Sequence, residues 1–214
     1  MINIFNRIKA VTKRAYTNGQ PDRKGLVFIP DISGFTELVG STDQITGRSI
    51  TYELLSSIIQ NNKLDLEVAE IEGDAVFFFK WQQLPDTDEI MEQFKAMKTA
   101  FDQTRATLEI KYNLKLNLEL KAVAHYGPMS EYYLGGFRKL YGQVVVEAHR
   151  LLKNKVPQTS YLLITDELSE ACAGKDLEIL QDDNDQSSRL CEIYQDLRNI
   201  CYSYTSFEKS FATN

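Results

Sequence analysis

Hydrophobic and polar positions follow two periods along the chain, and the period of two marks the strands. Short apolar or alternating segments bounded by turn residues predict β-strands, and these segments are 25–31, 64–72, 75–80, 116–127 and 161–165. The pair 64–72 and 75–80 is joined by Gly73-Asp74 and predicts a hairpin with an aspartate in its turn. Further strands are expected within 189–206.

The second period is helical. Apolar residues that return every three or four positions predict amphipathic helices, and these segments are 46–62, 88–112 and 143–153. The segment 165–174 predicts a short helix opened by Thr165 or Asp166 as its cap. Strands and helices mixed in this order predict an α+β sandwich with helices packed on one face of a sheet.

Composition supports one globular domain. The chain has 214 residues, of which 43% are hydrophobic and 25% charged, ordinary proportions for a single domain with a substantial core. We expect a basic N-terminal extension over 1–24, one domain over 25–208 and a C-terminal tail over 209–214. The extension carries Ile4, Phe5, Ile8 and Val11 among basic residues. A loosely docked tail is favoured, and a basic amphipathic segment that touches an anionic membrane or a partner is the alternative.

Charge and cysteine usage narrow the classes of function. The 30 acidic and 24 basic residues give a net charge of -6, which disfavours a nucleic-acid-binding protein. No apolar stretch approaches the roughly 20 residues of a membrane span, and the start has no signal-peptide pattern. Cys172, Cys191 and Cys201 form no CxxC pair, so reduced thiols and a cytoplasmic location are expected.

Two aspartates stand at predicted strand ends beside glycine. Asp31 lies in Pro-Asp-Ile-Ser-Gly-Phe-Thr, and Asp74 lies in Glu-Gly-Asp-Ala. Each aspartate alone is typical of a turn or a cap. Together they predict a site for a hard divalent cation, which prefers oxygen ligands. The segment Gly34-Phe35-Thr36 then begins a helix, whose free N–H groups are suited to phosphate.

Four segments resemble the ordered motifs of the class III nucleotidyl cyclases, the adenylate and guanylate cyclases. They are FIPDISGFT (28–36), EIEGDA (70–75), KAVAHYG (121–127) and YGQVVVEAHRL (141–151). The match is closest to a divergent bacterial branch with no assigned function. The resemblance implies a ferredoxin-like βαββαβ sandwich with an antiparallel-rich sheet, and a homodimer that binds a purine nucleoside triphosphate.

The resemblance also implies roles for single residues. Asp31 and Asp74 match the metal-binding aspartates, and the backbone carbonyl of Ile32 is a further expected ligand of a two-ion Mg²⁺ or Mn²⁺ site. In the family the ions activate the ribose 3′-hydroxyl and hold the triphosphate. Arg150 matches the arginine that neutralises transition-state charge across the dimer, and Glu70 matches a purine-selecting position, where guanylate-making members carry glutamate.

Three departures weaken the case for catalysis. The nucleotide-binding positions include Val146 in place of the ribose-orienting asparagine, and a valine side chain cannot form a hydrogen bond. Lys139 stands at the second purine-selecting position and matches neither type. The late phosphate-binding lysine has no clear counterpart in 192–204, where Arg198 is the nearest cation. Losing one transition-state donor typically costs about 10²–10³ in rate.

Two hypotheses therefore remain. One is an active Mg²⁺/Mn²⁺-dependent cyclase that uses Asp31, Asp74 and Arg150. The other, which the departures favour, is a signalling module that binds metal and nucleotide or dimerises, with weak or no cyclase activity. Outside these motifs, His125 is interpreted as structural, His149 as a surface or interface residue, and 182–185 as a solvated acidic turn.

Overall fold

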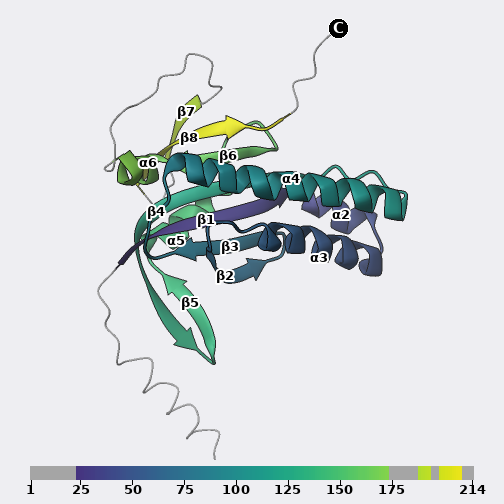
Figure 1. Cartoon of the computed structure of the whole chain (residues 1–214), viewed down its shortest axis with the longest axis horizontal. Coiled ribbons are helices and arrows are strands. Elements are labelled where there is room, and N and C mark those ends of the chain that lie inside the picture. The colour runs from purple at the N-terminus through teal and green to yellow at the C-terminus, as the bar shows by residue number, and fades with distance from the viewer. Residues whose placement is uncertain (1–22, 174–187, 194–197, 209–214) are drawn as a thin grey trace, which may run out of the picture.

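The computed structural model describes residues 23–173, 188–193 and 198–208, which form one sheet with helices on both faces (Figure 1). The strands are β1 (Arg23–Ser33), β2 (Glu67–Glu72), β3 (Ala75–Lys80), β4 (Glu119–Leu134), β5 (Phe137–Tyr141), β6 (Tyr161–Thr165), β7 (Ser188–Ile193) and β8 (Asn199–Ser206). The helices are α2 (Phe35–Ser41), α3 (Gln44–Gln60), α4 (Thr87–Tyr112), α5 (Gln143–Leu151) and α6 (Asp166–Ala173). The strand order is β2-β3-β1-β4-β6-β8-β7, and β5 pairs with β4 outside this path. All pairings are antiparallel except that of β4 with β6.

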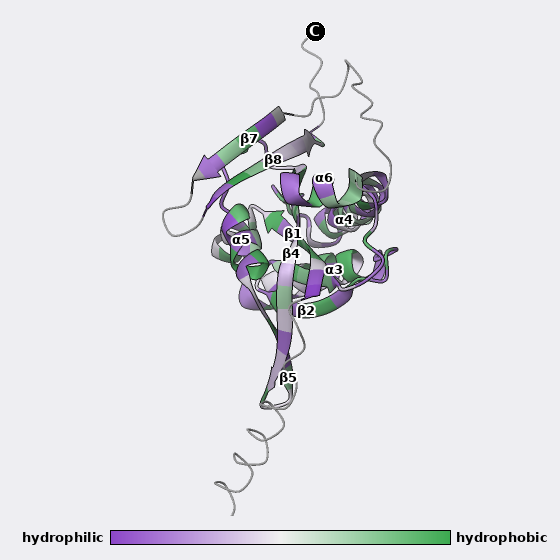
Figure 2. Ribbon diagram, turned by 90° about the vertical axis from the view of Figure 1, so that its left-hand side faces the viewer, coloured by the Kyte–Doolittle hydropathy of each residue, from purple (hydrophilic) through white to green (hydrophobic). Residues whose placement is uncertain are grey.

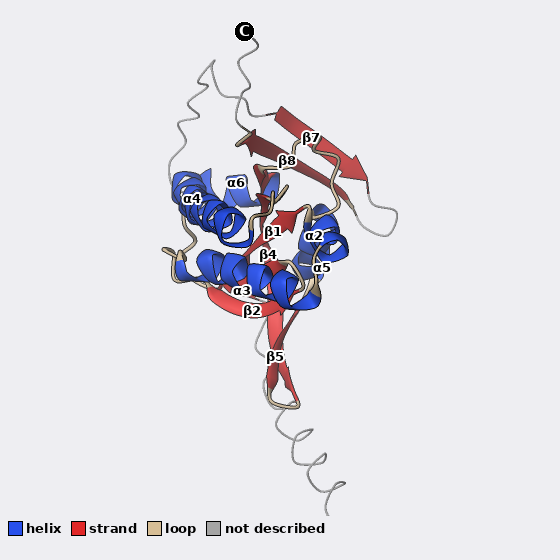
Figure 3. Cartoon of the chain, turned by 90° about the vertical axis from the view of Figure 1, so that its right-hand side faces the viewer, coloured by secondary structure: helices blue, strands red, loops and turns tan. Residues whose placement is uncertain are grey.

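The centre of the sheet is the pair β1 and β4. Side chains alternate across β1, so that Phe28 faces one layer and Val27 and Ile29 face the other. The first layer contains α3, α4 and α6, and Figure 3 shows α5 on the opposite side of the sheet. The predicted α+β class and antiparallel-rich sheet are confirmed. The expectation that helices pack on one face alone is corrected, because α5 covers the second face through Val144 and Ala148.

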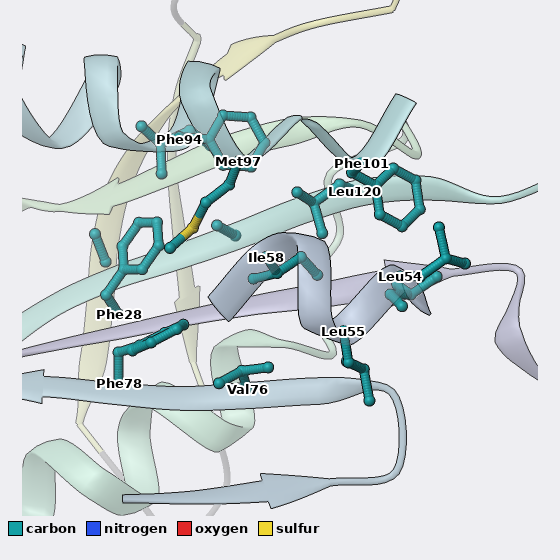
Figure 4. Packing of buried hydrophobic residues seen from close by; sticks show 14 of the residues in the cluster. Phe28, Leu54, Leu55, Ile58, Val76, Phe78, Phe94, Met97, Phe101 and Leu120 are labelled. Atoms are coloured by element: carbon teal, nitrogen blue, oxygen red, sulfur yellow. The ribbon is translucent and has the colours of Figure 1, made fainter. Parts of the chain in front are cut away.

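The main core lies between the sheet and the helices α3 and α4. Figure 4 shows the aromatic and aliphatic side chains of this layer meeting between the two helices and the strands. The labelled members include Phe28, Phe78, Phe94, Met97 and Phe101, and each is 1% exposed or less. Burial of this kind contributes about 1.5–3 kcal/mol for each large apolar side chain.

Helix boundaries follow from capping aspartates. Asp43 accepts hydrogen bonds from the backbone of Ile45 and Thr46, so α3 begins two residues before the predicted start. Asp86 and Glu89 form a reciprocal capping box at the start of α4. Such caps satisfy backbone N–H groups that lack helical partners.

A hairpin that the sequence analysis did not predict projects from the body of the domain (Figures 1 and 2). This β4–β5 arm, residues 130–141, turns at Gly135 and Gly136, whose φ angles are 60° and 89°. Consecutive positive φ values suit the tight turn of a hairpin and favour glycine. The arm carries large exposed apolar side chains, which are Tyr132, Tyr133, Leu134, Phe137 and Tyr141.

The expectation of reduced thiols is wrong for two of the three cysteines. Cys191 and Cys201 are opposite each other in β7 and β8, with Cα atoms 4.0 Å apart, and form a disulfide. A cross-strand pair of this kind depends on a register that no local motif reveals. Cys172 is buried, with its Sγ 3.2 Å from the carbonyl oxygen of Pro85.

Three of the expectations from sequence concern segments that the structure does not describe. The N-terminal extension (apart from residues 23 and 24), the acidic run 182–185 and the C-terminal tail 209–214 lie outside the described residues. Among the described helices, none combines the length and apolarity needed to cross a membrane.

Candidate functional site

Asp31 and Asp74 lie at the same end of the central strands. Asp31 is opposite Ala75 in the register of β1 and β3, so Asp74, one residue earlier in the turn after Gly73, comes next to it. The backbone N–H of Ile32 donates to the carbonyl oxygen of Asp74 over 3.2 Å. Burial raises the pKa of the Asp74 carboxyl, and the charge of Asp31 raises it further. The two carboxylates therefore lie close enough to repel each other.

Lys121 forms an ion pair with Asp31, and no role was expected for it from the sequence. It is opposite Asp31 in β4, and its Nζ lies 3.2 Å from Oδ2 of Asp31. The same ammonium donates to the carbonyl oxygen of Leu152 over 3.2 Å. One positive charge thus faces two carboxylates, so the group has a net negative charge when both carboxylates are ionised.

Gly34 begins the turn from β1 into α2. Its φ of 88° is left-handed, and a Cβ atom there would lie 2.2 Å from the carbonyl oxygen of Asn117. Only glycine fits this position without a shift of the backbone. Helix α2 starts at Phe35, and Thr36 is exposed beside the end of β1.

Glu70 and Lys139 form an ion pair between β2 and β5. The hydrogen bond to Glu70, followed by the charge of Glu70, raises the pKa of the Lys139 ammonium. A second pair beside it, Arg138 with Glu67, also joins the β4–β5 arm to β2. The two residues that the sequence assigns to purine selection therefore form an ion pair with each other.

Val146 and Arg150 lie one turn apart on the outer face of α5. Val146 is 49% exposed, and Arg150 is exposed and makes no ion pair with any residue that the structure describes. The predicted common face is present, because residues four apart are neighbours on a helix. Both side chains are available to a second molecule.

A buried polar network fixes the inner face of α5. His125 is fully buried, with Nδ1 2.8 Å from the Thr165 hydroxyl and Nε2 2.8 Å from Glu147. Arg198 donates to both carboxylate oxygens of Glu147 over 2.8 and 3.0 Å, and it also binds Glu167. His125 is structural, as the sequence analysis expected.

Arg198, the cation nearest in sequence to the expected phosphate-binding lysine, pairs with Glu147 and Glu167. Together with Glu147 it lines a cavity of about 440 Å³ that also contacts Lys24 and Gly127, at the opposite end of β1 from Asp31. At this end of the sheet Arg198 belongs to the hydrogen-bond network around Glu147. Lys121 is the described cation that contacts Asp31.

Comparisons with known proteins identify the family. The model of a family described as "Protein of unknown function (DUF2652)" matches residues 51–161. A Mycobacterium tuberculosis protein described as "Uncharacterized protein Rv2561/Rv2562" is 31% identical over 126 residues, which are 55% of this chain and 58% of that protein. The chain thus spans little more than half the length of this relative.

Solved structures identify the fold. The guanylyl cyclase Cya2 has a TM-score of 0.68 at 11% identity, covering 92% of this chain and 98% of that one. The adenylyl cyclase CyaB from Pseudomonas aeruginosa has a TM-score of 0.59 at 16% identity, covering 91% and 98%. A class III adenylyl cyclase-like ATP-binding protein from Pseudomonas aeruginosa has a TM-score of 0.60 at 15% identity, covering 70% of this chain and 34% of that one. The chain has the class III nucleotidyl cyclase fold, and it belongs to the family described as a protein of unknown function, DUF2652.

Proposed function

We propose that this cyclase-like domain binds a purine nucleoside triphosphate with Mg²⁺ or Mn²⁺ between two copies of the chain, and turns it over at or near background. The observation that carries the proposal is the contrast within the site. The convergent pair Asp31 and Asp74 is retained, whereas the exposed face of α5 offers Val146 where a ribose contact is needed.

The residues around Asp31 fit a hard divalent ion. Asp31, Asp74 and the backbone carbonyl of Ile32 would hold it with oxygen ligands. Burial and, after it, the charge of Asp31 raise the pKa of the Asp74 carboxyl, and a bound cation would favour its ionised form. When bound, Mg²⁺ or Mn²⁺ neutralises the triphosphate and acidifies the ribose hydroxyl.

Phosphate contacts would come from the same end of the sheet. Lys121 already contacts Asp31, so its ammonium can bind phosphate oxygens once a metal ion compensates the carboxylates. The backbone N–H groups of Gly34, Phe35 and Thr36 lie at the start of α2, beside the end of β1.

Base recognition would fall to Glu70 and Lys139. A glutamate accepts hydrogen bonds from N1–H and the 2-amino group of guanine, which adenine does not offer in that arrangement. GTP is therefore expected to bind better than ATP. Equal or reversed preference would mean that the Glu70–Lys139 pair stays closed and fills the pocket.

A second copy of the chain supplies the other half of the site in this proposal. The exposed apolar side chains of the β4–β5 arm form a surface of the kind that protein interfaces cover. Val146 and Arg150 face outward on α5, where a partner's triphosphate can meet them. One similar structure is described as an ATP-binding class III adenylyl cyclase-like protein, and the proposal gives this chain the same class of ligand.

An active cyclase is the second candidate. It is favoured by Arg150, an exposed guanidinium one helical turn from the ribose position, together with Asp31 and Asp74. In this case Arg150 would stabilise the charge that develops on the α-phosphate.

One experiment separates the two candidates. Purified protein is incubated with Mn²⁺–GTP or Mn²⁺–ATP, and cyclic nucleotide and pyrophosphate are measured against the Asp31→Asn/Asp74→Asn variant as background. The proposal predicts product formation within a few-fold of that variant. Robust turnover that the double substitution abolishes would establish the cyclase instead.

A further inference from the structure

We infer that Glu70, Glu72 and His149 form a binding site for a borderline transition-metal ion such as Zn²⁺, apart from the Asp31–Asp74 pair but sharing Glu70 with the proposed purine contact. The two glutamates are two positions apart on β2 and therefore point to the same side of the sheet. This is the side that α5 covers, because Glu72 pairs with Ala75 and Glu70 pairs with Phe77, and both partners pack against α5. His149 comes from α5 itself.

The geometry brings one ligand atom from each side chain together. These atoms all lie within 4.8 Å of one another, and His149 Nδ1 is 3.5 Å from Glu72 Oε2. Ligand atoms bound to one Zn²⁺ lie about 2.0–2.2 Å from it, so they are typically 3–4 Å apart. Small rotations of the two glutamate side chains would close the remaining difference.

The imidazole distinguishes this group from an ordinary acidic surface. The His149 ring packs on Phe77 of β3, with ring centroids 5.1 Å apart, and its Nδ1 lies 3.5 Å from Glu72 of β2. Its side chain is 32% exposed, so water can complete the coordination shell. One imidazole with two carboxylates suits Zn²⁺ better than Mg²⁺, which prefers oxygen ligands alone. The site therefore differs in chemistry from the all-oxygen pair of Asp31 and Asp74.

Lys139 competes with the metal ion for the carboxylate of Glu70. Its ammonium binds Glu70, and Glu72 also contributes to raising its pKa. A bound Zn²⁺ would replace this positive charge and use the Glu70 oxygen that Lys139 now holds. Removing the ammonium should therefore strengthen metal binding, whereas a purely structural ion pair would leave it unchanged.

The test is calorimetric titration of the full chain with Zn²⁺, in the Asp31→Asn/Asp74→Asn background and with excess Mg²⁺ present. We expect one Zn²⁺ per chain. Substitution of residues that only support metal ligands costs 10–100-fold in affinity, so His149→Ala and Glu72→Gln should each weaken binding by about tenfold or more. Lys139→Met should tighten it. Glu53→Gln removes an exposed carboxylate from α3, on the opposite face, and should change nothing.

The outcome is decided by the variants together. Thermal unfolding identifies any variant that fails to fold, and Glu72→Gln keeps the test valid if His149→Ala disturbs the contact with Phe77. Absence of Zn²⁺ binding, or binding that Glu72→Gln leaves unchanged, would overturn the inference. Because the background lacks Asp31 and Asp74, neither result depends on whether nucleotide binds.

Discussion

The substitution Glu147→Gln should destabilise the domain strongly, because Glu147 is a buried carboxylate with three hydrogen-bonding partners. Its side chain is 3% exposed and binds His125, Arg198 and Gln143. Burial alone would raise the pKa of Glu147, but these hydrogen bonds lower it from 4.5 to about 2. At 1.36 kcal/mol per pKa unit, the interactions favour the ionised folded state by about 3 kcal/mol.

The sign of the pH dependence follows from the lowered pKa. The stabilisation is complete above pH 4.5, the value for the unfolded chain, and is lost as the pH falls toward 2. The difference in unfolding free energy between the wild type and Glu147→Gln should be about 3 kcal/mol at pH 7. It should be about 1.4 kcal/mol smaller at pH 3.5, because the unfolded carboxylate is then mostly protonated.

Urea unfolding followed by circular dichroism at both pH values measures this difference. Glu170→Gln is the matched control, since Glu170 is an exposed glutamate that lines the same cavity, and surface substitutions usually change stability by less than about 0.5 kcal/mol. A destabilisation below about 1 kcal/mol, or one that does not change with pH, would refute the assigned network.

Three further predictions concern the proposed site and its dimer. In metal-free buffer Asp74→Asn should be neutral or stabilising at pH 7, because the raised pKa of Asp74 means that its ionised form opposes folding; a clear loss of stability in urea unfolding would show a structural role. Val146→Asn should raise residual cyclic product from Mn²⁺–GTP, since a placed hydrogen bond contributes most in the transition state, and unchanged product would show that the ribose contact does not limit turnover. Phe137 is 73% exposed on the β4–β5 arm, and Phe137→Glu should dissociate a dimer in analytical ultracentrifugation. The control Ile110→Glu, at an 85% exposed residue of α4, should not; equal effects of the two substitutions would exclude the arm as the interface.

Local sequence patterns were sufficient for most elements of the fold. The alternation over 116–127 and the helical period over 88–112 correspond to the observed β4 and α4, because burial on one face imposes a period on each. The strand β5 was missed because polar residues interrupt the apolar positions of the arm. Gly135-Gly136 between aromatic residues was the signal that could have revealed it.

The sequence predicts the residues of the candidate site but not all of their contacts. The motif around Asp31 identifies a carboxylate, but its contact with Lys121 depends on the register of β1 and β4. Arg198 was considered for phosphate, and only the tertiary structure reveals its pairing with Glu147. The sequence predicts a surface or interface role for His149, and only the tertiary structure shows that it contacts Glu72 on β2.

Metal-dependent nucleotide binding is the central claim, and one calorimetric titration tests it most directly. The wild type and the Asp31→Asn/Asp74→Asn variant are each titrated with GTP, with Mn²⁺ present and with Mn²⁺ removed by chelation. The account predicts that GTP binds the wild type only with Mn²⁺ and that the variant loses this binding. Equal binding with and without Mn²⁺, equal binding to the variant, or no binding to the wild type would contradict it.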